Sequence, residues 1–309
     1  MTEKMYKYFP GENLSLVFAK DGFCGIKCSL PKDYNDPYEL FLGVDLGVSP
    51  GLLAAYRDIV QELPQYPTTC FSKSPTVTPM WAHYANNHSG FVLEFDVEEI
   101  KANFEEISVS DVQYKDSPDE KIKGFLERAS GTKKPRHAIW LQDMVLFQAY
   151  FSKSTAWSYE QERRIVADLK YCEVVSGNII LFLPMICLSS IIVGKNIGLD
   201  ANALSVELAT KNSLNWYATV IGKSRAQPFF KDLGGSVSIF DGNKIISAEN
   251  SCGSCSDPIS TGLEFCPWCS ITDAHKQKAA NGNPLRIMDH YGLLQDYYKG
   301  IEKIRRGTR

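Results

Sequence analysis

The spacing of apolar residues divides most of the chain into short helices and strands. Leu53, Tyr56 and Val60 recur three or four residues apart behind Pro50, which predicts a helix over 50–63. Residues 23–30 instead alternate in polarity and predict a strand. The same criteria predict further strands at 6–9, 68–72, 91–95, 107–114, 160–169, 179–183, 190–193 and 216–221, and further helices at 13–20, 79–86, 97–104, 119–129, 136–153 and 201–211.

This order of elements predicts an α+β fold, with a mixed, largely antiparallel sheet and flanking helices. We expect residues 1–242 to form this main domain. Residues 243–309 are expected to form a small zinc-ribbon module followed by a helical tail at 285–305.

The composition is that of a globular protein with a core, since 44% of its 309 residues are hydrophobic and 22% are charged. A formal charge of -3 gives no general attraction to nucleic acid or anionic membranes. The first residues, MTEKMYKYFPGENL, lack the apolar core of a signal peptide, and Pro184 interrupts the most apolar stretch, 178–193. We therefore expect a cytoplasmic protein without a membrane partner.

Four cysteines near the C-terminus have the spacing of a metal site. Cys252 and Cys255 form one CxxC pair, and Cys266 and Cys269 form a second after ten residues. Two such turns present four thiolates to one tetrahedral Zn²⁺, which leaves no coordination position for a catalytic water. The motif predicts a structural zinc ion whose binding is coupled to the folding of this module.

The other five cysteines, Cys24, Cys28, Cys70, Cys172 and Cys187, stand singly within apolar runs. This pattern is typical of buried thiols in a reducing compartment and not of a disulfide framework.

Seven short blocks in residues 6 to about 222 resemble a bacterial family that is catalogued as domain of unknown function 2971. The blocks are Tyr6-Lys7-Tyr8; Asn35-Asp36-Pro37 with Glu39; Cys70-Phe71-Ser72; Met80-Trp81-Ala82-His83-Tyr84 with Gly90-Phe91; Lys153 with Trp157; Tyr159-Glu160-Gln161-Glu162-Arg163; and Ile192-Val193-Gly194. This resemblance implies no activity.

The order of elements also resembles the start of ADP-ribosyltransferase-like domains. These carry a basic or His residue beside an aromatic on the first strand, a Ser or Tyr on a later element and a Glu on a late strand. The resemblance implies that Lys7 or Tyr8 takes the first place, Ser72 or Tyr84 the second and Glu162 the third, with Glu160 completing an ExE pair.

We accordingly expect catalytic roles for Glu162, Glu160, Tyr84 and His83, and binding of nicotinamide adenine dinucleotide (NAD) by Lys7, Tyr8, Ser72 and Trp81. Cleavage of the nicotinamide glycosidic bond passes through an oxocarbenium-like state that needs a nearby carboxylate. On one strand the two glutamates would point to the same face. One would hold the ribose while the other positions an acceptor, and Trp81 or Tyr84 would stack on the nicotinamide.

Structural interpretations of these residues stay open. Glu160, Glu162, Arg163 and Arg164 could be a solvated row of charges on an exposed strand. The apolar spacing of the Met80–Tyr84 block is equally typical of core, His83 could be a hydrogen-bonding histidine, and Asn35-Asp36-Pro37 has the composition of a turn. Lys153 could pair with a carboxylate or bind phosphate.

Three functions follow from these alternatives. The first is an NAD-consuming ADP-ribosyltransferase-like effector or toxin, of the kind that serves bacterial defence against phage, with a protein or nucleic-acid acceptor. The second is a nucleic-acid-directed protein or nuclease that uses the zinc ribbon and the basic residues Lys303, Arg305, Arg306 and Arg309. The third is a sensing or interaction module without chemistry, which binds a partner protein through the zinc module.

Overall fold

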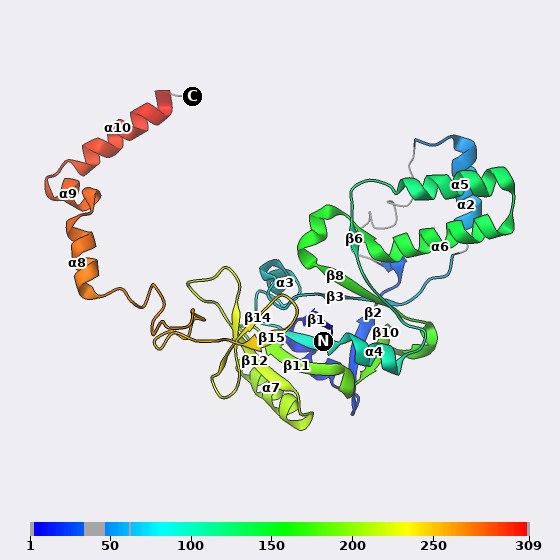
Figure 1. Ribbon diagram of the computed structural model, residues 1–309, viewed down its shortest axis with the longest axis horizontal. Coiled ribbons are helices and arrows are strands. Elements are labelled where there is room, and N and C mark those ends of the chain that lie inside the picture. Colours follow the sequence, from blue (N-terminus) through cyan, green and yellow to red (C-terminus); the bar gives the residue numbers. More distant parts are fainter. Residues whose placement is uncertain (1–2, 34–46, 62, 308–309) are drawn as a thin grey trace. The chain divides into compact units, whose positions relative to one another are not determined.

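The computed structural model describes residues 3–33, 47–61 and 63–307 (Figure 1). The predicted Asn35-Asp36-Pro37 turn lies outside these residues. The chain divides into two compact units. The first comprises residues 1–221 and 227–247, and the second comprises residues 222–226 and 248–309.

The first unit is built on a sheet that has ten strands in the described part of the chain. Strands β11 and β12 pair in parallel, and the other neighbours in this sheet are antiparallel. The prediction of an α+β fold with a mixed, largely antiparallel sheet is confirmed. In spatial order the strands are β15 (Ile245–Ser247), β14 (Val237–Phe240), β13 (Phe229–Lys231), β12 (Asn215–Val220), β11 (Leu188–Val193), β4 (Phe91–Asp96), β1 (Lys4–Phe9), β3 (Thr68–Ser72), β8 (Glu162–Val166) and β5 (Ser108–Asp111).

Two smaller sheets also lie in the described part of this unit. One has the order β2 (Phe23–Cys28), β10 (Asn178–Pro184) and β9 (Cys172–Val175), and the other pairs β6 (Gln113–Tyr114) with β7 (Ser152–Lys153). The sequence pattern did not indicate β9, β13, β14 or β15, because strands of three or four residues are too short to show a clear period.

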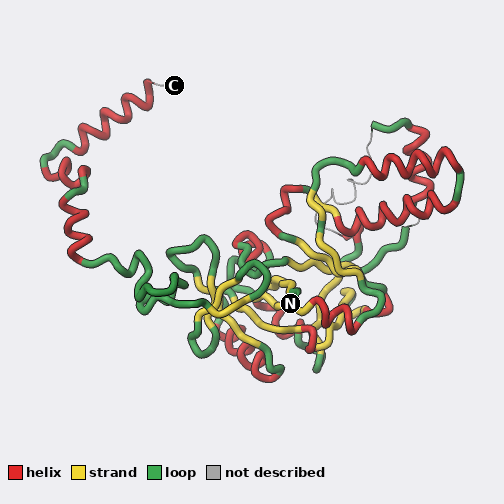
Figure 2. Tube along the Cα trace, in the orientation of Figure 1, coloured by secondary structure: helices red, strands yellow, loops and turns green. Residues whose placement is uncertain are grey.

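The helices of this unit lie close to the predicted positions. Figure 2 draws the helices in red. Their starts follow local capping. Ser49 accepts a hydrogen bond from the backbone of α2, and Asp96 accepts two from the first turn of α4. The α-helices are α1 (Leu14–Val17), α2 (Pro50–Val60), α3 (Thr78–His83), α4 (Val97–Asn103), α5 (Glu120–Thr132), α6 (Pro135–Phe151) and α7 (Leu199–Lys211).

Buried apolar side chains cover both faces of the central strands. Along β1, Met5 and Phe9 belong to a core shared with β2, β10, α1 and α4, whereas Tyr6 and Tyr8 belong to a second core with α3. The alternation of a strand therefore distributes consecutive residues between two cores. Helices α2, α5 and α6 pack on one another around a third cluster (Figure 1).

The main sheet opens between β1 and β3. All six residues of β1 pair with β4, but only Tyr6 has a paired residue on β3, Ser72. Beyond this pair the ammonium of Lys7 donates a hydrogen bond to the carbonyl of Cys70 at 2.8 Å. A side-chain hydrogen bond thus stands where a backbone bond would continue the pairing, and residues of both strands line a cavity there.

Gly90 lies where β4 begins and packs directly against the backbone of β1. A Cβ atom at this position would lie 2.0 Å from the carbonyl oxygen of Phe9 and 2.9 Å from the Cα of Ala85. Because both are backbone atoms, neither can rotate away. This close approach gives a structural reason for the Gly90-Phe91 block of the sequence.

We therefore expect Gly90→Ala to lower the free energy of unfolding by about 3 kcal/mol or more, a loss on the scale of severe core substitutions. Gly124→Ala is the matched control, since Gly124 lies within α5 with nothing within 4 Å of the added Cβ. The free energy of unfolding of this control should rise by roughly 0.5–1 kcal/mol, the difference in helix propensity between glycine and alanine. Urea unfolding of both variants measures the difference, and equal stability of the two would show that the Gly90 backbone can shift.

Up to residue 307, the second unit contains the four clustered cysteines and three helices. These are α8 (Asp273–Asn281), α9 (Pro284–His290) and α10 (Leu294–Gly307). They lack a buried residue, and large side chains such as Tyr297 and Ile304 are exposed. Among the described residues of both units, every helix is too short or too polar to cross a lipid bilayer.

Candidate functional site

A cavity of about 210 Å³ lies at the opening between β1 and β3. Five consecutive residues of β3, 68–72, line it, although neighbouring residues of a strand point to opposite faces. The cavity therefore reaches the edge of this strand and not merely one face of the sheet. Its lining consists of Tyr6, Lys7, Tyr8, Lys27, Ser29, Asp33, Thr68, Thr69, Cys70, Phe71, Ser72, Met80, Tyr84, Lys153, Trp157, Glu160, Glu162 and Arg164.

Two glutamates and one lysine form the centre of the site. The ammonium of Lys153 donates hydrogen bonds to Oε2 of Glu160 at 2.7 Å and to Oε2 of Glu162 at 2.9 Å. All three residues are buried: Lys153 is 8% exposed, Glu160 is 3% exposed and Glu162 is 2% exposed. The interpretation of the glutamates as a solvated row of charges is therefore wrong, because burial at this level requires the charges to be paired.

Each glutamate has a second partner of its own. The hydroxyl of Tyr84 donates to Oε1 of Glu160 at 2.6 Å, whereas Nε of Arg164 donates to Oε1 of Glu162 at 2.6 Å. Arg164 also donates to the carbonyl of Tyr150 at 2.8 Å, which ties the guanidinium to the end of α6. One carboxylate is thus held by a neutral phenol and the other by a fixed positive charge.

This difference moves the pKa values of the two carboxyl groups apart. Burial raises the pKa of Glu160, and the charge of Lys153 only partly offsets the effect. Burial acts on Glu162 in the same direction, but the charges of Arg164 and Lys153 overcome it and lower the pKa of Glu162 to about 2. Titratable pairs with separated pKa values are typical of sites in which one group moves a proton and the other stays charged.

The backbone around the glutamates differs from the predicted strand at 160–169. Glu160 ends a 3-10 helix, Thr155–Glu160, and β8 begins only at Glu162. Gln161 between them has a φ of 47°, in the left-handed region. The two carboxylates therefore converge because the chain turns at Gln161, and not because they share the face of one strand.

Lys7, Tyr8 and Ser72 line the same cavity as the glutamates. Lys7 is half-buried, and desolvation lowers its pKa. Tyr8 donates to the carbonyl of Ser74 at 2.9 Å, and Ser72 accepts from the backbone N–H of Ser74 at 3.2 Å. These bonds close the turn after β3, so both side chains hold the cavity wall in place.

Two residues expected at the site lie elsewhere. Trp81 is fully buried behind the cavity, where Nε1 donates to the carbonyl of Pro75 at 2.8 Å and the ring meets Tyr8 edge-on. It supports the wall and is not among the lining residues, so the core interpretation of the block fits Trp81 but not Met80 or Tyr84, which line the cavity. His83 is exposed on α3 and also does not line the cavity.

Several lining residues received no role from the sequence. Arg164 follows the Tyr159–Arg163 block directly, but an arginine in a run of charged residues gives no sign of burial. Trp157 lies within the matching blocks, and its ring lies 4.8 Å from the ammonium of Lys153. Cys70 was expected to be buried, but it is exposed to the cavity. Desolvation and the charge of Glu162 raise the pKa of Cys70 to about 12, so its thiol stays protonated at neutral pH.

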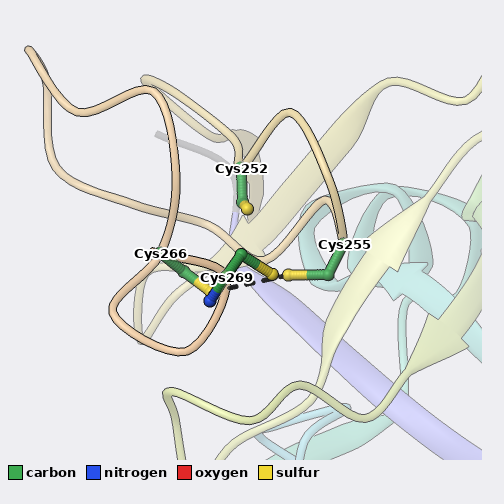
Figure 3. Close-up of side chains that lie close together, drawn as sticks. All are labelled: Cys252, Cys255, Cys266 and Cys269. Carbon is green, nitrogen blue, oxygen red and sulfur yellow. Dashed lines mark hydrogen bonds between the residues drawn. The ribbon is translucent and has the colours of Figure 1, made fainter. Parts of the chain in front are cut away.

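The second unit holds a candidate metal centre (Figure 3). The sulfur atoms of Cys252, Cys255, Cys266 and Cys269 all lie within 4.8 Å of one another. The two CxxC turns have the same backbone closure, because the N–H of Ser256 bonds to the carbonyl of Cys252 and the N–H of Ser270 bonds to that of Cys266. A further bond joins the N–H of Gly253 to the carbonyl of Glu264.

The donor set and its spacing fit a tetrahedral metal ion. Zinc–sulfur bonds of about 2.3 Å place tetrahedral thiolates roughly 3.8 Å apart. The sulfurs of Cys255 and Cys266 are 3.6 Å apart, and the N–H of Cys269 lies 3.4 Å from the sulfur of Cys266, as in the N–H···S bonds that support thiolate ligands. All nine cysteines lie in the described part of the chain, and all are free of disulfides.

Comparison with known proteins gave one family match, which covers part of the chain. Residues 80–165 match the model of the family described as protein of unknown function (DUF2971). The match spans α3 to β8 and therefore includes Tyr84, Lys153, Glu160 and Glu162, while the cysteine cluster lies outside it. Comparisons with curated proteins and with solved structures found no match.

Proposed function

We propose that this protein is an ADP-ribosyltransferase-like enzyme that cleaves the bond between nicotinamide and ribose in NAD. The observation that carries the proposal is the convergence of Glu160 and Glu162 on Lys153 inside one cavity. The register of the main sheet adds support. Glu162 on β8 pairs with Ser72 on β3, and Ser72 pairs with Tyr6 on β1. Lys7 is the next residue of β1 after Tyr6. The three positions implied by the resemblance thus lie on adjacent strands.

Glu162 is the group suited to stabilise the reacting ribose. As the glycosidic bond breaks, its electron pair leaves with the nicotinamide nitrogen and positive charge develops on the ribose. A carboxylate with a pKa of about 2 stays negative at every physiological pH. Arg164 fixes its orientation in advance, and preorganised charges of this kind are commonly the largest contribution to catalysis.

Glu160 is suited to accept the proton of the attacking nucleophile. The oxygen of water or of an acceptor hydroxyl forms the new bond to the anomeric carbon, and its proton passes to a carboxylate oxygen. Burial raises the pKa of Glu160, which makes it a stronger base than an ordinary glutamate. Lys153 holds the two carboxylates near each other despite their mutual repulsion.

The cavity volume restricts which part of the substrate enters. Pockets for ligands of drug size commonly enclose about 300–1,000 Å³, so a cavity of about 210 Å³ would hold the nicotinamide end and leave the rest outside. Tyr84 and Trp157 offer aromatic surfaces for the ring. Lys7 and Lys27 line the same cavity without a carboxylate partner among the described residues, and they would attract the phosphates.

The cysteine cluster is proposed to hold one Zn²⁺ through Cys252, Cys255, Cys266 and Cys269. Four thiolates would fill its coordination sphere, so the ion would act in folding and not in the reaction. A partner protein or nucleic acid remains the proposed ligand of this module.

The test is incubation of the full chain with NAD, followed by mass spectrometry of the small molecules and of the protein. We expect free nicotinamide together with ADP-ribose or an ADP-ribosylated protein. Parallel samples with single- and double-stranded nucleic acid test the nuclease alternative. If nucleic acid is cleaved and NAD stays intact, the nuclease alternative replaces the proposal. If NAD and nucleic acid both stay intact with candidate acceptors present, the result favours the interaction module.

A further inference from the structure

Helix α6 carries an apolar stripe on its outer side. Its inner side packs on α2 and α5 through buried residues such as Leu141 and Val145. Outside, Ile139, Trp140 and Phe147 are 54%, 46% and 43% exposed. Residues spaced by one, seven and eight positions lie on one side of a helix over two turns. These three side chains therefore form one outer stripe, in which the charged Asp143 lies between Ile139 and Phe147.

A shallow hollow adjoins the stripe. Phe125 and Arg128 of α5, together with Trp140, Asp143 and Met144 of α6, line about 460 Å³. Most of this lining is apolar, so the hollow can receive an apolar side chain from another surface. The stripe and the hollow together offer both a projection and a recess, as a self-complementary interface requires.

Two opposite charges lie on the same side of α6 as the stripe. Arg136 lies one turn before Trp140, and Asp143 lies about one turn after Ile139. Seven residues, or two turns, separate them, which is too far for an ion pair within one helix. Within the described residues neither makes a hydrogen bond or an ion pair, although the guanidinium of Arg136 lies 6.0 Å from the ring of Trp140.

We propose that the outer stripe of α6 binds the same stripe of a second copy of this chain. Two antiparallel α6 helices related by a two-fold axis would place Ile139 of each copy opposite Trp140 of the other. In an antiparallel pair, three residues toward the start of one helix correspond to three residues toward the end of the other. Position 136 of each copy is therefore opposite position 143 of the other. Arg136 of each copy therefore meets Asp143 of the other, and one interface contains two identical ion pairs.

This charge order favours a second copy over an unrelated partner. The stripe has a positive residue at one end and a negative residue two turns later. A second copy of the same helix, running in the opposite direction, therefore presents the complementary charges. Phe147 would lie against the start of α6 and the preceding turn of the other copy. Because the apolar contact is small, the dimer should be weak, with a dissociation constant on the order of micromolar, as for interfaces at the small end of the range.

Sedimentation of the full chain over a range of concentrations tests the proposal. Wild type should show a reversible monomer–dimer equilibrium. Arg136→Glu and Asp143→Arg should each weaken it about tenfold or more, because like charges would face each other twice per dimer. The double variant Arg136→Glu with Asp143→Arg restores opposite charges across the interface and should recover most of the affinity.

Arg57→Glu is the matched control, since Arg57 is an exposed arginine on α2 of the same helical cluster and should leave the equilibrium unchanged. Circular dichroism confirms that each variant folds. A monomer at every concentration would overturn the proposal. So would a dimer that ignores both single reversals, or one that the double variant does not restore.

Discussion

Glu162→Gln is expected to lower the rate of nicotinamide release by about 10²–10³-fold, the usual cost of losing one preorganised electrostatic contact in a transition state. Glutamine keeps the shape and one acceptor oxygen but removes the charge that the oxocarbenium-like state requires. Arg164 would lose its charged partner, so the midpoint of thermal unfolding should also fall. The activity is therefore to be measured well below that midpoint, with circular dichroism of the same sample.

A matched control separates catalysis from stability. Glu94 is also a buried glutamate on the main sheet, where it accepts from Tyr6 at 2.9 Å and from Ser190 at 2.8 Å, but it does not line the cavity. Glu94→Gln should destabilise the protein and retain most of the nicotinamide release. Glu160→Gln should affect transfer to an acceptor more than cleavage of NAD. Equal release by wild type, Glu160→Gln and Glu162→Gln would assign the glutamates a purely structural role.

Cys266→Ser is expected to remove the metal and unfold the second unit while the first unit remains folded. Binding of structural zinc supplies about 10–16 kcal/mol in small zinc modules, far more than the small cluster of buried residues around Ile259 could replace. We expect one zinc per wild-type chain by elemental analysis and much less in the variant. Limited proteolysis should then cut the variant within residues 248–309 and spare the main sheet.

The control for this experiment is Cys172→Ser, which removes a cysteine on β9 and should leave the metal content unchanged. Carefully purified wild type without zinc would refute the metal assignment. A Cys266→Ser chain that kept both its zinc and its protease resistance would show that the fourth thiolate is dispensable.

Local patterns in the sequence determined much of the fold. The alternation in 23–30, the proline at the start of 50–63 and the two CxxC spacings act over a few residues, and the chain has little freedom to override them. For this reason α2, β2 and the cysteine cluster lie close to where the pattern placed them. The matching blocks of the sequence also indicated Lys7, Ser72, Glu160 and Glu162, which line one cavity.

The tertiary structure decided the protonation and the surroundings of these groups. Whether Glu162 is a surface charge or a buried carboxylate depends on Arg164 and on Lys153, and the position of Lys153 depends on where α6 ends. Trp81 and Tyr84 belong to one short block, yet one lies behind the cavity and the other within it. Desolvation and the pairing of charges depend on segments that are far apart along the chain. The spacing of residues within one segment therefore cannot predict them.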